Sequence, residues 1–148
     1  MSSLPPTAST ARSVRGILDT STVIFLQRLT DVTALPAEPL ITAVTLAELS
    51  VGPLLATDES ERAARQAHLQ QAEADFEPLP FDAAAARAFG GVAASLRRSG
   101  RKATARAYDA MIAAIAVAND LPVYTYNPAD FSGIAGLEVV AVPLPEAP

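Results

Sequence analysis

Residues 104–131 read TARAYDAMIAAIAVANDLPVYTYNPADF, and this stretch decides the fold class. An amphipathic surface helix carries polar residues at a spacing of 3.6, whereas residues 110–118 are apolar on every face. An Asn-Asp pair and then Pro122 end the helix, and residues 123–125 have the apolar, β-favouring composition of a short strand. The pattern therefore predicts a buried helix packed beside an interior strand.

Two acids belong to this unit. Asp109 opens the helix and shares its face with Ile112 and Ala116, while Asp130 comes just after the strand. An unpaired carboxylate on a buried face is costly. Asp109 therefore needs compensation, and a metal ion could supply it.

Composition limits the class of protein. The 148 residues suffice for one domain that buries roughly two thirds of its unfolded surface. The absence of cysteine excludes disulfides and thiolate metal sites and suits a reducing cytoplasm. No apolar run approaches the roughly 20 residues of a membrane span. We expect a cytoplasmic domain over residues 14–142, without a membrane partner, flanked by a flexible segment at 1–13 and a Pro-rich tail at 143–148.

The net charge of −5 is unevenly distributed along the chain. Residues 83–108 contain basic side chains and no acid. Such a patch on an acidic body is typical of a phosphate-binding surface. The alternative is a solvated, Arg-rich helix end, because C-terminal helical turns favour cations.

Strands and helices alternate along the rest of the chain. Further strands are expected at residues 14–18, 40–43, 77–81 and 137–142, and further helices at residues 20–29, 45–56, 59–76 and 83–98. This alternation predicts a three-layer α/β/α fold around a central, mostly parallel sheet. Ligands of such sheets bind outside the carboxyl ends of the strands.

Acidic residues follow three of the expected strands. Asp19 comes directly after the first strand, Glu48 shortly after the second, and Asn127 and Asp130 after residues 123–125. Two carboxylates about 5 Å apart repel by roughly 3 kcal/mol at an effective dielectric of 20, so four together need a cation or partial protonation. Oxygen ligands favour Mg²⁺ or Mn²⁺ over zinc.

Each acid also has a structural interpretation. Asp19 has the residue type and position of a helix N-cap, and Glu48 of an exposed helical glutamate. Asp109 suits a helix N-terminus and Asp130 a turn after Pro128. These alternatives stay open at the level of single residues.

Three segments, GILDTSTVI, TAVTLAELSVG and YDAMIAAIAVANDLPVYTYNPADF, together span most of the chain and resemble the PIN domain of VapC-type toxins. The resemblance implies a PIN-like fold in which Asp19, Glu48 and Asp109 are catalytic, metal-binding acids. Either Asn127 or Asp130 completes the set, and we expect Asp130 to do so. The supporting polar residues are then Thr20, Ser21, Thr125 and Asn127.

The same resemblance implies a function. A VapC-type protein is a Mg²⁺- or Mn²⁺-dependent endoribonuclease, the toxin of a type II toxin–antitoxin pair, which forms a homodimer and is neutralised by a VapB antitoxin. We expect an antitoxin helix to bind between residues 44–56 and 59–76. The basic segment before Asp109 would hold the RNA backbone, through Arg97, Arg98, Arg101, Lys102 and Arg106.

Other classes lack their required residues. A haloacid dehalogenase-type phosphatase needs a second Asp where this chain has Ser21, and no phosphate-binding glycine motif is present. The only histidine, His68, lies on a polar helix and is expected at the surface. A catalytically silent PIN-like module that binds RNA or protein remains the alternative function.

Overall fold

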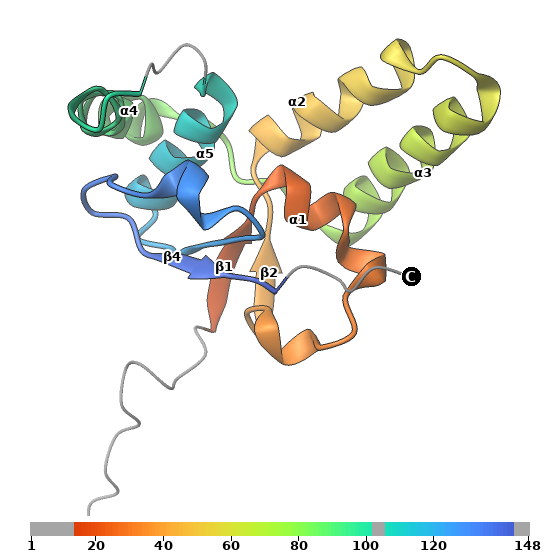
Figure 1. Ribbon diagram of the computed structural model, residues 1–148, viewed down its shortest axis with the longest axis horizontal. Helices are drawn as coiled ribbons and strands as arrows, with labels where there is room; N and C mark the ends of the chain where they lie inside the picture. The colour runs from red at the N-terminus through yellow and green to blue at the C-terminus, as the bar shows by residue number, and fades with distance from the viewer. Residues whose placement is uncertain (1–13, 102–105, 144–148) are drawn as a thin grey trace, which may run out of the picture.

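The computed structural model describes residues 14–101 and 106–143, in which four parallel strands form one sheet (Figure 1). Their order across the sheet is β2-β1-β3-β4. The bounds are β1 Arg15–Leu18, β2 Glu38–Leu40, β3 Val123–Thr125 and β4 Val139–Ala141. The predicted mostly parallel sheet is therefore confirmed. The segments expected at 1–13 and, beyond Pro143, in the tail lie outside the described residues.

Helices cover both faces of this sheet (Figure 1). The α-helices are α1 Thr20–Ile24, α2 Ala43–Val51, α3 Glu59–Asp75, α4 Ala83–Arg98 and α5 Ala107–Ala118. Short 3-10 turns are η1 Leu26–Arg28, η2 Val32–Ala34, η3 Gly52–Leu55 and η4 Pro128–Phe131. Helices α4 and α5 pack together over one face, and α1 and α3 lie over the other, which gives the predicted three layers.

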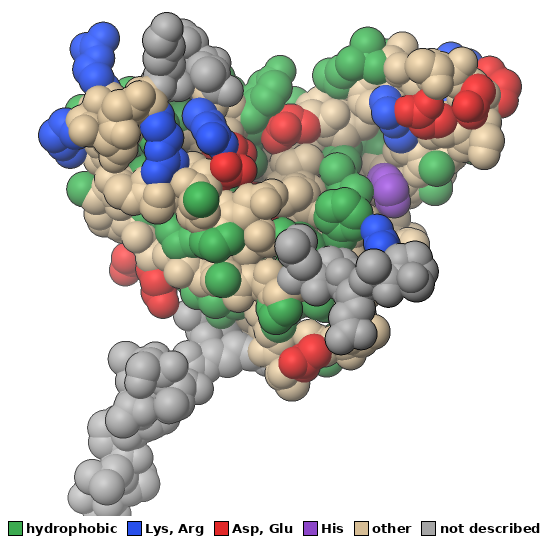
Figure 2. All heavy atoms as spheres, in the orientation of Figure 1, with side chains coloured by type: hydrophobic (Ala, Val, Ile, Leu, Met, Phe, Trp, Pro, Cys, Tyr) green, Lys and Arg blue, Asp and Glu red, His purple; other side chains and the backbone are tan. Residues whose placement is uncertain are grey.

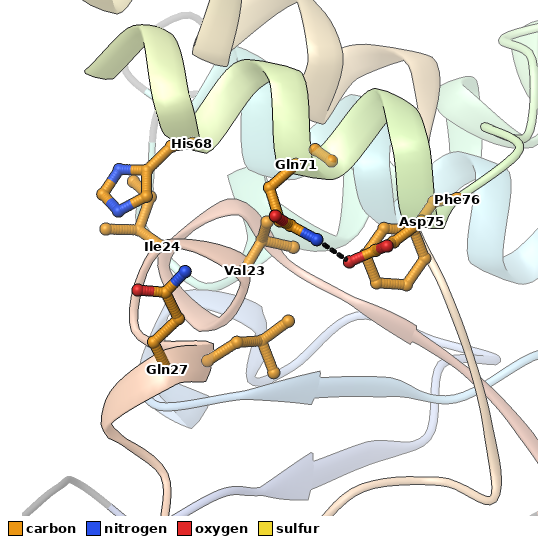
Figure 3. Close-up of a pocket in the computed structure, with 9 residues that line it drawn as sticks. Val23, Ile24, Gln27, His68, Gln71, Asp75 and Phe76 are labelled. Carbon is orange, nitrogen blue, oxygen red and sulfur yellow. Dashed lines mark hydrogen bonds between the residues drawn. The ribbon is translucent and has the colours of Figure 1, made fainter. Parts of the chain in front are cut away.

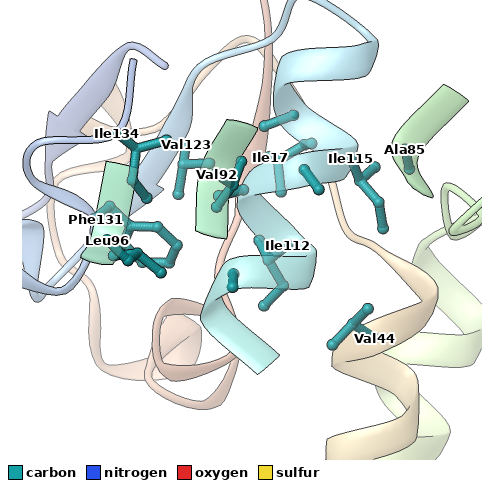
Figure 4. Close-up of a cluster of buried hydrophobic side chains, with 14 residues drawn as sticks. Ile17, Val44, Ala85, Val92, Leu96, Ile112, Ile115, Val123, Phe131 and Ile134 are labelled. Atoms are coloured by element: carbon teal, nitrogen blue, oxygen red, sulfur yellow. The ribbon is translucent and has the colours of Figure 1, made fainter. Parts of the chain in front are cut away.

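The two faces of the sheet carry separate apolar clusters because successive strand residues point to opposite sides. Ile17 and Val123 join the cluster beneath α4 and α5, which Figure 4 shows. Leu18 and Tyr124 join the cluster on the α1 and α3 side. The side-chain alternation in β1 and β3 thus builds both halves of the core.

Helix α5 is the central element of the first cluster. Its residues Ala110 and Ile112 to Ala116 are fully shielded from solvent, which confirms the buried helix expected there. Asp109 stands in its first turn and is only half-buried. The helix therefore has a polar start and an apolar body.

Strand β2 begins two residues earlier than expected. The expected bounds of 40–43 were wrong, since residues 41–43 lie outside this strand. In the structure Pro39 pairs with Gly16 in β2. A proline is tolerated there because β2 is an edge strand. The expected strand at 77–81 is reduced to one bridge between Thr42 and Leu79.

Two helices also differ from expectation. The helix expected over 20–29 ends at Ile24 and continues as η1. Helix α2 begins at Ala43, capped by Thr42, two residues before the expected start, and Glu48 lies in its second turn. Within the described ranges, no helix combines the length and apolarity needed to cross a bilayer.

Candidate active site

Asp19 joins the end of β1 to the start of α1. Its carboxylate caps the helix by accepting the N–H of Thr22 at 3.1 Å. The hydroxyl groups of Thr22 and Thr125 donate to it at 2.6 and 2.7 Å, and that of Ser21 at 3.2 Å. Only 4% of Asp19 is exposed. This carboxylate is thus held in one orientation by donors from two elements, and its role as a helix N-cap is confirmed.

Thr125, the last residue of β3, connects the two central strands at this end of the sheet. Its hydroxyl donates to Asp19 and accepts the backbone N–H of Asn127 at 2.9 Å. Thr125 is fully buried, whereas Asn127 is exposed. Thr125 therefore orients Asp19, and Asn127 contributes to this contact through its backbone.

Glu48 reaches the same region from α2. The hydroxyl of Thr20 donates to Glu48 Oε1 at 2.6 Å and lies 2.9 Å from the hydroxyl of Thr45. Burial raises the pKa of Glu48, the Thr20 hydrogen bond lowers it, and the charge of Asp19 raises it further. The exposed-glutamate interpretation is wrong, because Glu48 is half-buried and hydrogen-bonded to α1.

Asp109 has the largest electrostatic perturbation at this end of the sheet. Burial, followed by the charges of Asp130, Asp19 and Glu48, raises the pKa of Asp109 from 3.8 to about 6. The guanidinium of Arg106 opposes this effect, with its Nη1 atom 4.0 Å from Asp109 Oδ2. All four predicted acids therefore lie near enough to act on one another electrostatically.

Asp130 is held by two arginines. Its carboxylate forms an ion pair with Arg106, and its backbone carbonyl accepts a hydrogen bond from Arg101 at 3.2 Å. Arg101 also donates to the carbonyl and hydroxyl oxygens of Ser132. Asp130 is therefore more than a turn residue, since it links η4 to both ends of the segment at 101–106.

The donor chemistry at this site suits a hard divalent cation. The side chains offer carboxylate and hydroxyl oxygens, and burial together with the charges of the neighbouring acids raises the pKa of Asp109. Among the described residues, however, no three acidic or histidine side chains are arranged to share one ion. The neighbouring acids can affect the pKa of Asp109 without being close enough to share an ion, because charge interactions extend beyond coordination distance. Coordination of one cation would require side chains such as that of Asp130 to rotate.

The basic residues divide into two groups. Arg97 and Arg98 are exposed at the C-terminal end of α4, and Arg98 also donates to Ser95 Oγ at 3.2 Å. Arg101 and Arg106 are instead bonded to Asp130. Figure 2 shows basic side chains gathered on the α4 side of this face and acidic ones at the far end of the α2–α3 hairpin. Lys102 lies outside the described residues.

A hollow lies between α1, η1 and α3 (Figure 3). It has a volume of about 300 Å³ and is lined by Val23, Ile24, Leu26, Gln27, His68, Gln71, Ala72, Asp75 and Phe76. The groove expected between residues 44–56 and 59–76 stays a prediction, since this hollow draws lining residues only from the second of those segments. His68 is half-buried in its wall rather than fully at the surface.

Sequence reasoning missed the contacts that orient the acids. Thr22 and Thr45 are both fully buried and both bond within the site, and Arg101 fixes the backbone at Asp130. The two threonines belong to the segments that resemble the family, and a buried hydroxyl requires a partner. Nothing local indicated the long-range partners of Arg101.

Known proteins resemble this chain over most of its length. The family description "PIN domain" matches residues 17–137. The chain is 40% identical over 131 residues to Ribonuclease VapC5 of Mycobacterium tuberculosis (strain ATCC 25618 / H37Rv), covering 86% of this chain and 95% of that protein. It is 30% identical to Ribonuclease VapC of Rickettsia bellii (strain RML369-C), again over 131 residues, covering 86% and 96% of the two chains.

A solved structure shares the fold. A chain from the crystal structure of VapBC-5, a member of the VapBC family of toxin–antitoxin systems from Mycobacterium tuberculosis, superposes with a TM-score of 0.75 at 39% identity. The match covers 87% of this chain and 99% of that one.

Proposed function

The chain belongs to the PIN-domain family, and from this premise we propose that it is a ribonuclease toxin of a toxin–antitoxin pair. Its reaction is the hydrolysis of RNA phosphodiester bonds. Two relatives that match most of its length are named ribonucleases, and a similar solved chain belongs to a toxin–antitoxin complex. The observation that carries the proposal is the contact geometry of the acids. Asp19 accepts from Thr125 and Glu48 accepts from Thr20, while Asp109 and Asp130 both lie at Arg106.

We assign the metal site to Asp19, Glu48, Asp109 and Asp130. Their oxygen donors favour Mg²⁺ or Mn²⁺. When bound there, such a cation helps to deprotonate water and neutralises charge at a phosphodiester under attack. Between Asn127 and Asp130 as the fourth ligand, we favour Asp130, because Asp130 acts on Asp109 electrostatically while Asn127 is exposed.

The other polar residues hold the acids in place. Thr125 and Ser21 donate to Asp19, and Thr20 donates to Glu48, so the first two acids are oriented before any substrate arrives. Preoriented donors and acceptors cost little reorganisation during a reaction. These hydroxyl groups are positioning groups, and their loss should weaken the site without removing its charge.

The RNA backbone is proposed to lie along the C-terminal end of α4. Arg97 and Arg98 are exposed there, and a polyanion needs positive charge beside an acidic site. Arg101 and Arg106 are engaged with Asp130, so they are weaker candidates for direct phosphate contact. Lys102 stays a proposal from the sequence alone.

For the partner, we propose a VapB-type antitoxin whose amphipathic helix occupies the hollow between α1, η1 and α3. The mixed lining of this hollow, with Val23 and Phe76 beside His68 and Gln71, suits a helix with one apolar face. We also propose a homodimer in solution, which light scattering on the purified toxin measures directly. Co-purification with the protein encoded next to it tests the antitoxin.

RNA cleavage by near-isosteric variants tests the reaction. Asp109→Asn and Glu48→Gln remove one charge each, and we expect cleavage of single-stranded RNA to fall by about 100-fold or more, beyond the 10–100-fold typical of residues that only support a metal ligand. Asp120→Asn is the matched control, because it removes an exposed carboxylate from the opposite end of α5. EDTA should abolish the activity of the parent protein.

The competing function makes the opposite forecast. A silent PIN-like module binds RNA but leaves it intact with Mg²⁺ or Mn²⁺ present. Cleavage that survives in both acidic variants would show contamination or a different active site. The proposed reaction at these acids would be refuted either by RNA that stays intact with metal present or by cleavage that survives in both variants.

A further inference from the structure

Arg106 is the residue whose placement the ribonuclease function does not explain. It is the N-cap of α5, and its guanidinium contacts two acids of the site. The guanidinium pairs with Asp130 from η4 and approaches Asp109 of its own helix to 4.0 Å. One positive charge is thus placed between two of the four assigned metal ligands.

The backbone around this ion pair is fixed independently of it. Arg101 bonds the carbonyl oxygens of Asp130 and Ser132, so η4 is tied to the end of α4 without Arg106. The ion pair itself involves only side chains, which are 38% exposed at Arg106 and 30% exposed at Asp130. Asp130 can therefore exchange partners by rotating its side chain, while the backbone stays in place.

We infer that Arg106 is a built-in counter-ion that competes with the divalent cation for Asp130 and Asp109 and thereby sets the metal affinity of the site. The inference rests on the proposed metal site. A carboxylate turned toward a guanidinium has fewer lone pairs directed at a metal, and a guanidinium beside a divalent cation is repelled by it. Metal binding must therefore displace Arg106.

This arrangement accounts for the present geometry of the acids. Four mutually repelling carboxylates would destabilise the metal-free protein, and Arg106 offsets part of that repulsion. The same contact keeps Asp130 from joining the other acids around one ion. In agreement with this, no three acidic or histidine side chains among the described residues are close enough to hold one metal ion.

Calorimetric titration of the full-length, metal-free chain with Mn²⁺ tests the inference by binding alone. For Arg106→Gln we expect the Kd for Mn²⁺ to fall about three- to tenfold, the size expected when a partly exposed ion pair no longer competes. Arg106→Lys keeps the charge but loses the planar, bidentate guanidinium, so its Kd should lie between the Kd of the parent and that of Arg106→Gln. Arg97→Gln removes an equal charge from an exposed side chain on α4 and should change the Kd less than about twofold.

A double-mutant cycle identifies the site of competition. In an Asp130→Asn background, Arg106→Gln should give a clearly smaller gain in Mn²⁺ affinity, because the contested carboxylate is gone. Circular dichroism of each variant confirms folding, and the lysine variant remains informative if the glutamine variant is unstable.

The possible failures are distinguishable. If Arg106→Gln binds Mn²⁺ no more tightly than the parent, or if Arg97→Gln gains as much, the competition is refuted while the metal site stands. If neither the parent nor any variant binds Mn²⁺, the proposed metal-dependent function falls and the inference falls with it.

Discussion

At the scale of the residue, Asp19 shows how one side chain serves structure and site together. The sequence left its role as helix cap and its role as metal ligand as alternatives. In the structure the carboxylate caps α1 and also accepts the hydroxyl of Thr125 from the neighbouring strand. A cap at the end of a parallel strand lies, by its position, where ligands of such folds bind.

Asp109 gives the first prediction, which concerns metal-free protein in EDTA. Because its folded pKa of about 6 exceeds its ordinary value of 3.8, the folded state binds this proton more tightly than the unfolded state. Stability from this group is therefore full below about pH 3.8, declines as the pH rises to about 6, and stays reduced above it. Asp109→Asn should remove that decline and raise the free energy of unfolding near neutral pH by about 1–2 kcal/mol, a value discounted for partial exposure.

Urea unfolding at pH 4.5 and pH 7.5 measures this effect. The stability difference between Asp109→Asn and the parent should be larger at pH 7.5. Added Mn²⁺ should reverse the order at neutral pH, because a ligand bound only to the folded parent stabilises it. An equal difference at both pH values would show that Asp109 is ionised without cost.

Two glycines give the second prediction. A Cβ at Gly16 would lie 2.6 Å from Cε1 of Tyr124, whose ring is buried between β1 and the second core cluster. Gly16→Ala should therefore cost about 1–3 kcal/mol through overpacking. At Gly90, inside α4, nothing lies within 4 Å of the added atom, so Gly90→Ala should stabilise by about 0.5–1 kcal/mol. Chemical denaturation of both variants checks the pair, and destabilisation of both would contradict this interpretation.

At the scale of the element, a strong local sequence pattern was sufficient to predict a helix or strand, and a weak pattern was not. Helix α5 and strand β3 were predictable because an all-apolar run followed by Pro122 admits few arrangements. The early end of α1 was not, since no Gly or Pro lies between Thr20 and Leu29. In the structure Phe25 ends that helix, with its ring 5.8 Å from Tyr126 and edge-on to it. Such tertiary contacts carry no local sequence pattern.

The site was predictable to the same degree. Asp19 and Glu48 follow expected strands, Asp109 opens the buried helix, and the family resemblance indicates all three. The ion pair of Arg106 with Asp130 could not be predicted, because it depends on how two side chains meet across the fold. The basic segment was therefore interpreted as one phosphate-binding surface, although part of it balances charge inside the site.

The third prediction concerns the link between β1 and β3. Thr125→Val keeps the shape of a buried residue but removes the hydroxyl that serves Asp19 and the N–H of Asn127. The loss of stability should be about 1–3 kcal/mol, because buried polar groups are left without a partner. Thr33→Val is the control, since Thr33 makes a similar hydroxyl contact to Asp31 at an exposed site, where water replaces it.

Melting temperature and RNA cleavage report separately on Thr125. If its hydroxyl positions Asp19, activity should fall at temperatures where the variant remains fully folded. A variant that loses stability but keeps full activity when folded would limit Thr125 to a structural role.

At the scale of the whole molecule, the strand order places the site. The chain leaves β1 toward β2 on one side and later returns to β3 on the other, so the order reverses between β1 and β3. Ligands of open α/β sheets bind outside the carboxyl ends of the strands at such a reversal. Asp19 and Thr125 stand at those two strand ends, which explains why acids far apart in sequence converge there.

The last prediction concerns the charge of the whole surface. A protein of net charge −5 binds RNA only where positive charge is concentrated, and the exposed Arg97 and Arg98 provide this at the C-terminal end of α4. In an Asp109→Asn background, which prevents cleavage, replacing both with Ala should weaken binding of single-stranded RNA at physiological salt. For every phosphate that the variant no longer neutralises, the slope of log K against log salt should become shallower by about 0.7.

Arg15→Ala combined with Arg87→Ala is the matched control, because it removes the same charge from the start of β1 and the first half of α4. Filter binding or fluorescence anisotropy across a series of salt concentrations gives both slopes. A shallower slope only for the Arg97 and Arg98 variant supports direct phosphate binding at the end of α4. Equal slopes for the two double variants would mean that the salt dependence follows only the total charge of the protein. The RNA backbone would then not be bound at the end of α4, and its path would have to cross another face of the molecule.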